Sequence, residues 1–333
     1  MTVANMTAWV RAVLLGVLLG LGTMGAHAAD NDAAAQVARE ATQPSNNAPV
    51  WRAVNEPTEH YSAIKTPEAG VLIQTSGQEW RLVRNGVITV YGGWLLSLAL
   101  AGVAMFFAIR GPIKLKEAKS GKLVKRFTLV ERYSHWAVAI TFIALAITGI
   151  FIMWGRYFLL PVIGGSLYGP LLFVFKNIHN LVGPLFTISL VVMFLVYVRD
   201  NMPTGDDIKW LLSGGKRAAH RFNGGEKLWF WAGVTFLGIV VSWTGWVLNS
   251  TIPGIDYFTR DTMQLANIVH GVAATLFVLM SIGHIYIGSI GTEGAYDGMS
   301  SGYVDESWAK EHHSLWLDDV NAGGDHRGKR SAS

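Results

Sequence analysis

The chain contains no cysteine and few charged residues. Without thiols it forms no disulfide and supplies no thiolate to an iron–sulfur cluster or a structural zinc site. Any redox centre must therefore rest on histidine, methionine or a non-covalent cofactor. Charged residues make up 15% of the 333 residues, against about 25% in an ordinary soluble domain. Apolar residues make up 51%, which indicates an integral membrane protein.

The basic residues gather in two segments that border apolar stretches. Residues 110–132 hold eight Lys or Arg and residues 199–227 hold six, whereas residues 249–264 hold only Arg260. Clustered Lys and Arg mark loops on the cytoplasmic side of a membrane. The pI near 9.2 is therefore explained by orientation in a membrane, and binding of nucleic acid is not expected.

Five apolar stretches are long enough to cross a bilayer, which takes about 20 residues of helix. We expect spans at 91–109, 133–154, 177–198, 228–248 and 265–289. Residues 157–175 are also apolar, but their prolines and glycines would leave backbone groups unpaired in lipid. This segment is predicted to be a re-entrant or interfacial loop on the outer side, because it contains Pro161, Gly164, Gly165, Gly169 and Pro170.

The segments outside the spans follow from this topology. Residues 1–29 are typical of a secretory signal peptide, ending in Ala26-His27-Ala28, with an uncleaved anchor as the alternative. Residues 30–90 are then a periplasmic extension, with short strands expected near Gly70–Gln74. Residues 291–333 form a polar cytoplasmic tail. Solvent-exposed histidines are expected in the tail and the preceding basic loop, at His220, His312, His313 and His326.

The last span carries two histidines, His270 and His284, and no Asp, Glu, Lys or Arg among its 25 residues. Fourteen residues of helix, at about 100° per residue, bring the second imidazole to within about 40° of the first and about 21 Å along the axis. Ionisable side chains inside a membrane helix are costly and mark functional sites. Two on one face indicate two metal centres stacked through the membrane.

Two further histidines lie at matching depths in other spans. His179 lies near the outer end of its span and is predicted to pair with His270, here called the outer pair. His135 lies near the inner end and is predicted to pair with His284, the inner pair. Two imidazoles saturate the iron of a b-type haem, so the pattern predicts two haems b. Helix–helix hydrogen bonding alone does not explain matched depths. Small residues leave room for porphyrins at Gly149, Gly183 and Gly288.

From about residue 125 to 316 the chain resembles the cytochrome b (gamma) subunits of membrane-bound respiratory formate dehydrogenases. The matching segments are RYSHW at 132–136, IHN at 178–180 with Gly183, VRDNMP at 198–203, DDIKWLL at 206–212, NGGEK at 223–227, HG at 270–271 with His284, and WAKEHH at 308–313. The resemblance implies an all-α integral membrane fold. We expect a four-helix di-haem cytochrome b bundle at 133–290, preceded by an additional transmembrane helix at 91–109 and the exported N-terminal segment.

The resemblance also implies a function and partners. In that family the four matching histidines ligate two haems b in the pairing given above. Electrons from a molybdenum- or tungsten-pterin (alpha) subunit, which oxidises formate, would pass through a periplasmic iron–sulfur (beta) subunit into the outer haem. The inner haem would reduce quinone near the cytoplasmic face of the bacterial inner membrane. The implied quinone site is lined by Asn223 and Glu226, and the chain also anchors the complex.

Other functions remain open at this point. The cytochrome b subunit of a nickel–iron hydrogenase or of a sulfur-compound reductase shares the broad fold, although the RDNMP and NGGEK segments favour formate dehydrogenase. A haem-free membrane anchor is an alternative of a different class. A transporter is disfavoured, because no acidic residue lies within any predicted span and no discontinuous helices are evident.

Overall fold

The structure is a computed structural model that describes residues 75–252 and 258–327, and upstream of them residues 52, 54, 56, 60–61 and 71–73. The chain divides into two compact units, residues 1–62 with 71–75 and residues 63–70 with 76–333. The predicted signal peptide and most of the predicted extension lie outside the described residues. In the first unit, β1 (His60–Tyr61) pairs antiparallel with β2 (Val71–Ile73), where the sequence predicts short strands.

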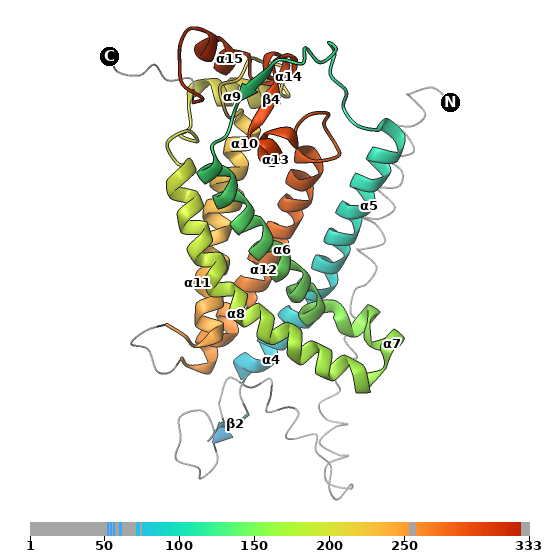
Figure 1. Ribbon diagram of the computed structural model, residues 1–333. Coiled ribbons are helices and arrows are strands. Elements are labelled where there is room, and N and C mark those ends of the chain that lie inside the picture. Colours follow the sequence, from blue (N-terminus) through green and yellow to red (C-terminus); the bar gives the residue numbers. More distant parts are fainter. Residues whose placement is uncertain are drawn as a thin grey trace, which may run out of the picture. The chain divides into compact units, whose positions relative to one another are not determined.

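Five helices in the described part of the chain are long and apolar enough to cross a membrane. The first combines α4 (Thr75–Leu82), the π-helical segment η1 (Val83–Tyr91) and α5 (Gly92–Arg110). The others are α6 (Leu129–Phe158), α8 (Gly165–Tyr197), the continuous run of α10 (Gly224–Leu228), π-helical η2 (Trp229–Leu237) and α11 (Gly238–Asn249), and finally α12 (Arg260–Gly288). The prediction of an all-α membrane protein with five spans is confirmed (Figure 1).

Two of these helices begin with a capping box, in which side chains satisfy the first unpaired amides of the helix. At the start of α6, the Glu131 amide donates to Thr128 Oγ1 and the Thr128 amide donates to Glu131 Oε2. At the start of α10, Asn223 and Glu226 exchange the same two bonds. Both glutamates therefore lie in the first turn of a helix, and the helices begin before the predicted spans.

The prediction that residues 157–175 form a loop is wrong, although they form no separate span, as predicted. Helix α6 continues to Phe158, a short α7 (Leu160–Ile163) follows, and α8 begins at Gly165. Gly164, with φ of 72°, makes the break between α7 and α8. Helix continues through Pro170 because one lost hydrogen bond costs less in lipid than a loop with many unpaired backbone groups.

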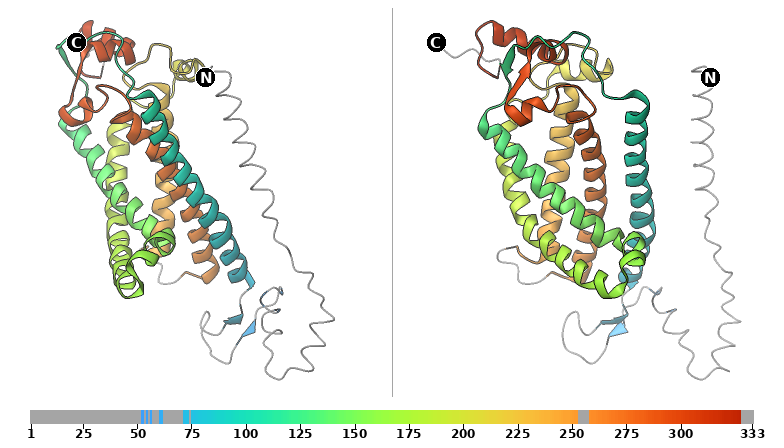
Figure 2. Two further views of the ribbon diagram at one scale, coloured as in Figure 1. Left: turned by 90° about the vertical axis from the view of Figure 1, so that its right-hand side faces the viewer. Right: turned by 45° about the vertical axis from the view of Figure 1, so that its right-hand side comes forward.

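The helix that contains the first predicted span starts earlier than that span, since residues 76–90 are also helical. The π-helical segment η1 contacts α6, because the carbonyl of Thr89 accepts a hydrogen bond of 2.7 Å from Trp154 Nε1. Gly93 allows this approach, since a Cβ there would lie 3.0 Å from the same nitrogen. Helix α5 otherwise packs along α12, on the outside of the four-helix bundle (Figure 2).

Helices α6, α8, α11 and α12, with η2, form the bundle and enclose an aromatic core. Phe142, Phe186 and Phe277 contact one another with ring centroids 4.7–6.4 Å apart. Phe277 lies seven residues from His270 and seven from His284 on α12. The three rings therefore fill the bundle midway between the two levels of histidines.

The tail is folded over one end of the bundle, here called the tail end (Figure 1). Strand β3 (Leu123–Lys125) pairs antiparallel with β4 (Tyr303–Asp305). Around this pair lie α9 (Gly205–Leu212), α13 (Asp297–Ser301), α14 (Glu306–His312) and α15 (Ser314–Asn321). Val304, Trp308 and Trp316 form a small apolar core that the polar composition of the tail does not suggest.

Candidate functional site

The structure brings the four intramembrane histidines together as two pairs. The ring centroids of His179 on α8 and His270 on α12 lie 6.2 Å apart. Those of His135 on α6 and His284 on α12 also lie 6.2 Å apart. Helix α12 therefore contributes one histidine to each pair, and the fourteen residues between them place the pairs at two levels of the bundle.

The spacing within each pair fits one metal ion between two imidazoles. A metal–imidazole bond is about 2.0–2.1 Å long, and the centre of a five-membered ring lies about 1.15 Å from each ring atom when the bonds are near 1.35 Å. Two coaxial rings that share one ion therefore have centroids about 6.3–6.5 Å apart. Both observed distances are 6.2 Å.

The donor set favours haem iron over a bare metal ion. No group of three or more His, Cys, Asp or Glu side chains is placed to hold a metal ion among the described residues. A porphyrin supplies four equatorial nitrogens, so its iron requires only two protein ligands. Space is also present beside the helices, because a Cβ at Gly183 or at Gly288 would meet no atom within 4 Å.

Threonine and glycine side by side contact each histidine of the outer pair. Thr148 Oγ1 lies 2.8 Å from His179 Nδ1, and Thr244 Oγ1 lies 3.0 Å from His270 Nδ1. The adjacent Gly149 faces His179, as a Cβ there would lie 3.4 Å from its Cε1. The sequence predicts Gly149 at this level, but it does not identify the threonines as partners.

The inner pair has a different environment. His135 Nδ1 is buried and has no hydrogen-bond partner in the part of the chain that the structure describes. Its ring lies edge-on to Trp136, with centroids 5.3 Å apart. His284 stacks on Trp229, with centroids 4.9 Å apart and an angle of 17° between the rings. Among the described residues, aromatic rings pack against both imidazoles of the inner pair, and no hydrogen bond joins either of them to a hydroxyl group.

The residues proposed for quinone binding lie at the same end of the bundle as the inner pair. Glu226 is three residues before Trp229, which stacks on His284. Glu226 and Asn223 also cap α10, so both have a structural role. Glu226 Oε1 forms an ion pair of 3.0 Å with Arg126, a residue that the sequence presents only as one of many basic loop residues.

His313 completes this cluster, and its predicted exposure to solvent is wrong. Its side chain is 1% exposed. Its Nδ1 lies 2.7 Å from the carbonyl of His220 and donates to it, so its Nε2 accepts from Arg126 Nη2 at 3.0 Å. Burial lowers the pKa of His313 to about 3, and the charge of Arg126 acts in the same direction. The signal in the sequence was the pair Trp308 and Trp316, which flank His313 and indicate a folded segment.

His326 is also less exposed than predicted, since its side chain is 22% exposed, whereas His220 is 47% exposed as expected. Burial lowers the pKa of His312 and of His326.

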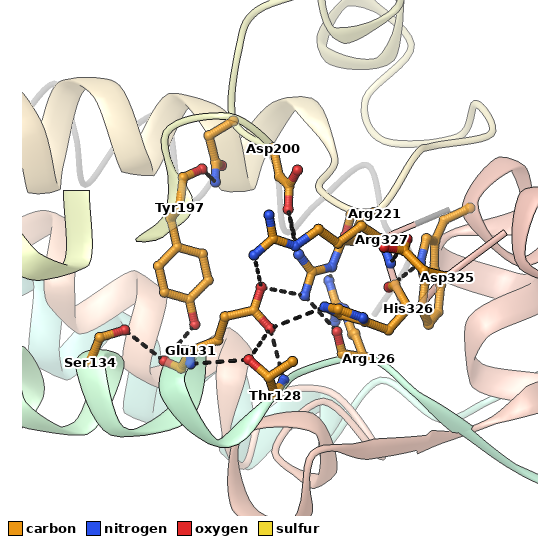
Figure 3. A network of polar contacts seen from close by, with 12 residues as sticks. Arg126, Thr128, Glu131, Ser134, Tyr197, Asp200, Arg221, Asp325, His326 and Arg327 are labelled. Atoms are coloured by element: carbon orange, nitrogen blue, oxygen red, sulfur yellow. Dashed lines mark hydrogen bonds and ion pairs between the residues drawn. The ribbon is translucent and has the colours of Figure 1, made fainter. Parts of the chain in front are cut away.

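A second buried network joins the tail to the helix ends (Figure 3). Arg221 bridges two carboxylates, with Nη2 2.9 Å from Glu131 Oε1 and Nη1 2.5 Å from Asp200 Oδ2. Arg327 of the tail lies 3.6 Å from Glu131 and 3.7 Å from Asp200. The Tyr197 hydroxyl donates to the Glu131 carbonyl at 2.8 Å, which ties α8 to α6. This network is structural, because each charge has a partner within it.

Comparisons with known proteins agree with this architecture. Residues 126–302, just over half of the chain, match the family described as prokaryotic cytochrome b561. The formate dehydrogenase cytochrome b556(fdo) subunit of Escherichia coli (strain K12) is 27% identical over 210 residues, which cover 59% of this chain and 93% of that protein.

Two further relatives carry similar names. The nitrate-inducible formate dehydrogenase cytochrome b556(Fdn) subunit of the same strain is 26% identical over 209 residues, covering 60% of this chain and 92% of the relative. A formate dehydrogenase cytochrome b556 subunit of Haemophilus influenzae is 28% identical over 200 residues, covering 56% and 78% respectively. The resemblance found in the sequence is thereby confirmed. The chain belongs to the prokaryotic cytochrome b561 family, an all-helical membrane family of the cytochrome b type.

Proposed function

We propose that this chain is the membrane cytochrome b subunit of a formate dehydrogenase complex and that it carries electrons through two haems b to quinone. The observation that carries this proposal is the placement of one α12 histidine in each of two pairs spaced for a single iron. The names of the relatives in Escherichia coli and Haemophilus influenzae support formate as the source of the electrons.

In this proposal, the four histidines are the haem ligands. His179 and His270 hold the outer haem, and His135 and His284 hold the inner haem, each through a neutral imidazole nitrogen. Bound haem iron supplies one-electron transfer by changing between its ferric and ferrous states. The helices position the four ligands and exclude water, and the aromatic core centred on Phe277 fills the bundle between the two levels.

The basic loops support the direction of transfer. Segments 110–132 and 199–227 lie at the tail end and, by the positive-inside rule, face the cytoplasm. The N-terminal segment then lies in the periplasm of a bacterium with the chain in its inner membrane. The outer pair lies near the periplasmic side, so electrons enter there and leave through the inner pair.

The absence of cysteine supports a need for partner subunits. This chain has no cysteine with which to hold an iron–sulfur cluster, so in this proposal a beta subunit holds the clusters that deliver electrons to the outer haem. Formate oxidation belongs to an alpha subunit with a molybdenum or tungsten pterin. This chain contributes quinone reduction and membrane anchoring to the complex.

The quinone site is proposed beside the inner pair, with Asn223 and Glu226 in contact with the quinone. In the capping box the Asn223 side chain uses its carbonyl oxygen, so its amide group is left to donate a bond. Glu226 is 37% exposed, and a carboxylate at this position can relay protons from the cytoplasm to a reduced quinone.

Haem quantification with single ligand variants tests the proposal. In the full chain in membranes, we expect His179→Ala and His135→Ala each to lose about half of the haem that the unaltered chain binds, with different spectral components remaining. His220→Ala, at an exposed position, should retain all of it. A chain without any reduced α-band would be a haem-free anchor, and a chain that kept both haems in both variants would have other ligands.

The identity of the electron donor has its own test. Complexes isolated with this chain should reduce quinone with formate and not with hydrogen. The reverse result would favour a hydrogenase cytochrome b subunit.

A further inference from the structure

The same dipeptide, Thr-Gly, faces each histidine of the outer pair from a neighbouring helix. On α6, Thr148 contacts His179 Nδ1 at 2.8 Å, and on α11, Thr244 contacts His270 Nδ1 at 3.0 Å. The following glycines lie against the same rings: a Cβ at Gly149 or Gly245 would lie 3.4 or 3.5 Å from the Cε1 atom. The two arrangements lie on different helices, and their Oγ1–Nδ1 distances differ by only 0.2 Å.

The direction of these hydrogen bonds follows from the other contacts of the hydroxyls. A threonine hydroxyl has one hydrogen and can otherwise only accept. Thr148 Oγ1 donates to the Ala144 carbonyl at 2.7 Å, and Thr244 Oγ1 donates to the Val240 carbonyl at 2.6 Å. Each oxygen therefore accepts from its histidine, and Nδ1 carries the imidazole proton. The lone pair is left on Nε2, the nitrogen that is free to bind iron.

The inner pair lacks this arrangement at one ligand. His135 Nδ1 has no hydrogen-bond partner among the described residues, and the rings of the inner pair pack against tryptophans. A bond from Nδ1–H to an acceptor increases the electron donation of a metal-bound imidazole. Stronger donation stabilises ferric over ferrous iron. Hydrogen bonds to both ligands would therefore lower the midpoint potential of the outer haem.

We infer that Thr148 and Thr244 are positioning residues of the outer haem, which hold both ligands in the Nε2-binding tautomer and lower the midpoint potential of that haem. This inference rests on the proposed function, since it requires haem at the outer pair. A lower potential in the outer haem directs electrons onward to the inner haem. The hydrogen bonds therefore contribute to the direction of transfer.

Redox titration of the full chain in membranes tests the inference. Thr148→Val and Thr244→Val keep the β-branched shape and remove the hydroxyl acceptor, but they leave the backbone carbonyls of Leu145 and Val241, which also interact with these histidines. Thr148→Ser and Thr244→Ser keep the hydroxyl. We expect the potential of one haem to rise in each valine variant, and to rise further in the double variant, while the other haem keeps its potential. The serine variants should retain the original potentials of both haems.

Thr141→Val is the matched control. Thr141 lies seven residues before Thr148 on α6 and donates to the Ala137 carbonyl at 2.7 Å in the same way, but none of its described hydrogen bonds involves a histidine. Loss of the outer haem in the valine variants but not in the serine variants would also support the inference. Unchanged potentials in the valine variants, or equal changes in valine and serine variants, would overturn it.

Failure of the proposed function would look different. If the unaltered chain bound no haem, or if His179→Ala left both haems in place, the outer pair would not be a haem site. The threonine variants are therefore read after His179→Ala has identified the outer haem by its spectrum.

Discussion

Glu131 and Glu226 occupy equivalent places, the third residue of α6 and of α10, and each is paired with a buried arginine. Glu131 lies 2.9 Å from Arg221, and Glu226 lies 3.0 Å from Arg126. Each arginine also donates to the backbone carbonyl of the other. Burial of Glu131 and of the two arginines is tolerable because these charges are paired and hydrogen-bonded together. The cluster thus joins two helix starts at the end of the bundle where we propose that quinone binds.

The proposed proton relay at Glu226 can be tested by Glu226→Gln. Glutamine keeps the capping box, which accepts either residue at this position, but it cannot exchange protons. We expect slower quinone reduction with a weaker dependence on pH, while haem content is unchanged. Rates that matched those of the unaltered chain at every pH would contradict the relay.

His313 should make stability depend on pH. Its pKa of about 3 in the folded chain lies below its ordinary value of 6.5 because the ring is buried beside Arg126. Below pH 6.5, His313 binds a proton in the unfolded chain but not in the folded chain. The free energy of unfolding therefore falls on acidification by about 1.4 kcal/mol per pH unit at most. The effect is confined to the window between about pH 6.5 and 3.

Thermal unfolding in detergent at several pH values measures this effect. His313→Gln should flatten the decline between pH 6.5 and 4.5, whereas His220→Gln, at an exposed position, should not. A parallel decline in the unaltered chain and in His313→Gln would show that other groups cause it.

At the scale of elements, α6 and the α10–η2–α11 helix have the same order of features along the sequence. Each begins with a capping box that contains a glutamate, and each carries Thr-Gly at the level of the outer pair. Glu131 precedes Thr148 by 17 residues, and Glu226 precedes Thr244 by 18. A π-helix takes up more residues per turn than an α-helix, so the π-helical segment η2 absorbs the additional residue. Thr244 therefore reaches His270 as Thr148 reaches His179.

The contact between Trp154 of α6 and the first transmembrane helix depends on Gly93. A Cβ at this position would lie 3.0 Å from Trp154 Nε1, whereas a Cβ at Gly102 on the same helix would meet no atom within 4 Å. Gly93→Leu should therefore displace Trp154 from the Thr89 carbonyl and lower stability by about 1–3 kcal/mol. Gly102→Leu should change stability by less than about 0.5 kcal/mol. Thermal unfolding of the two variants gives the comparison, and equal stability would contradict this account of the contact.

For the whole molecule, the proposed orientation determines the energetics of electron transfer. Electrons that move inward against an inside-negative potential require about 2.3 kcal/mol per 100 mV for the full distance. In the proposed function, the oxidation of formate by quinone supplies this energy. The orientation is therefore part of the mechanism and can be measured separately from it.

The absence of cysteine provides a clean test of the orientation. Ser45→Cys and Ser331→Cys each introduce a single thiol, one before the first span and one in the tail. With a membrane-impermeant maleimide, we expect Ser45→Cys to react in intact spheroplasts and Ser331→Cys only in inverted vesicles. The opposite pattern would reverse the proposed path of electrons.

The sequence by itself determined the class of the protein, the five long apolar helices and the pairing of the intramembrane histidines at two levels. Hydrophobic length and helical periodicity are local properties, so His270 and His284 could be placed on one face of a helix without a structure. The prediction failed where local signals conflicted. At Pro170, the requirement to pair backbone groups in an apolar segment prevailed over the tendency of proline to end a helix.

Only the tertiary structure decided what surrounds those histidines and what the tail does. The partners of His179 and His270 are 31 and 26 residues away along the chain, and contact between helices depends on their rotation, which the sequence pattern does not specify. Likewise, His313 is buried in contact with Arg126, 187 residues earlier in the chain. Such contacts depend on packing between distant segments. They determine the hydrogen-bond partners and the burial of each histidine, which the sequence alone does not show.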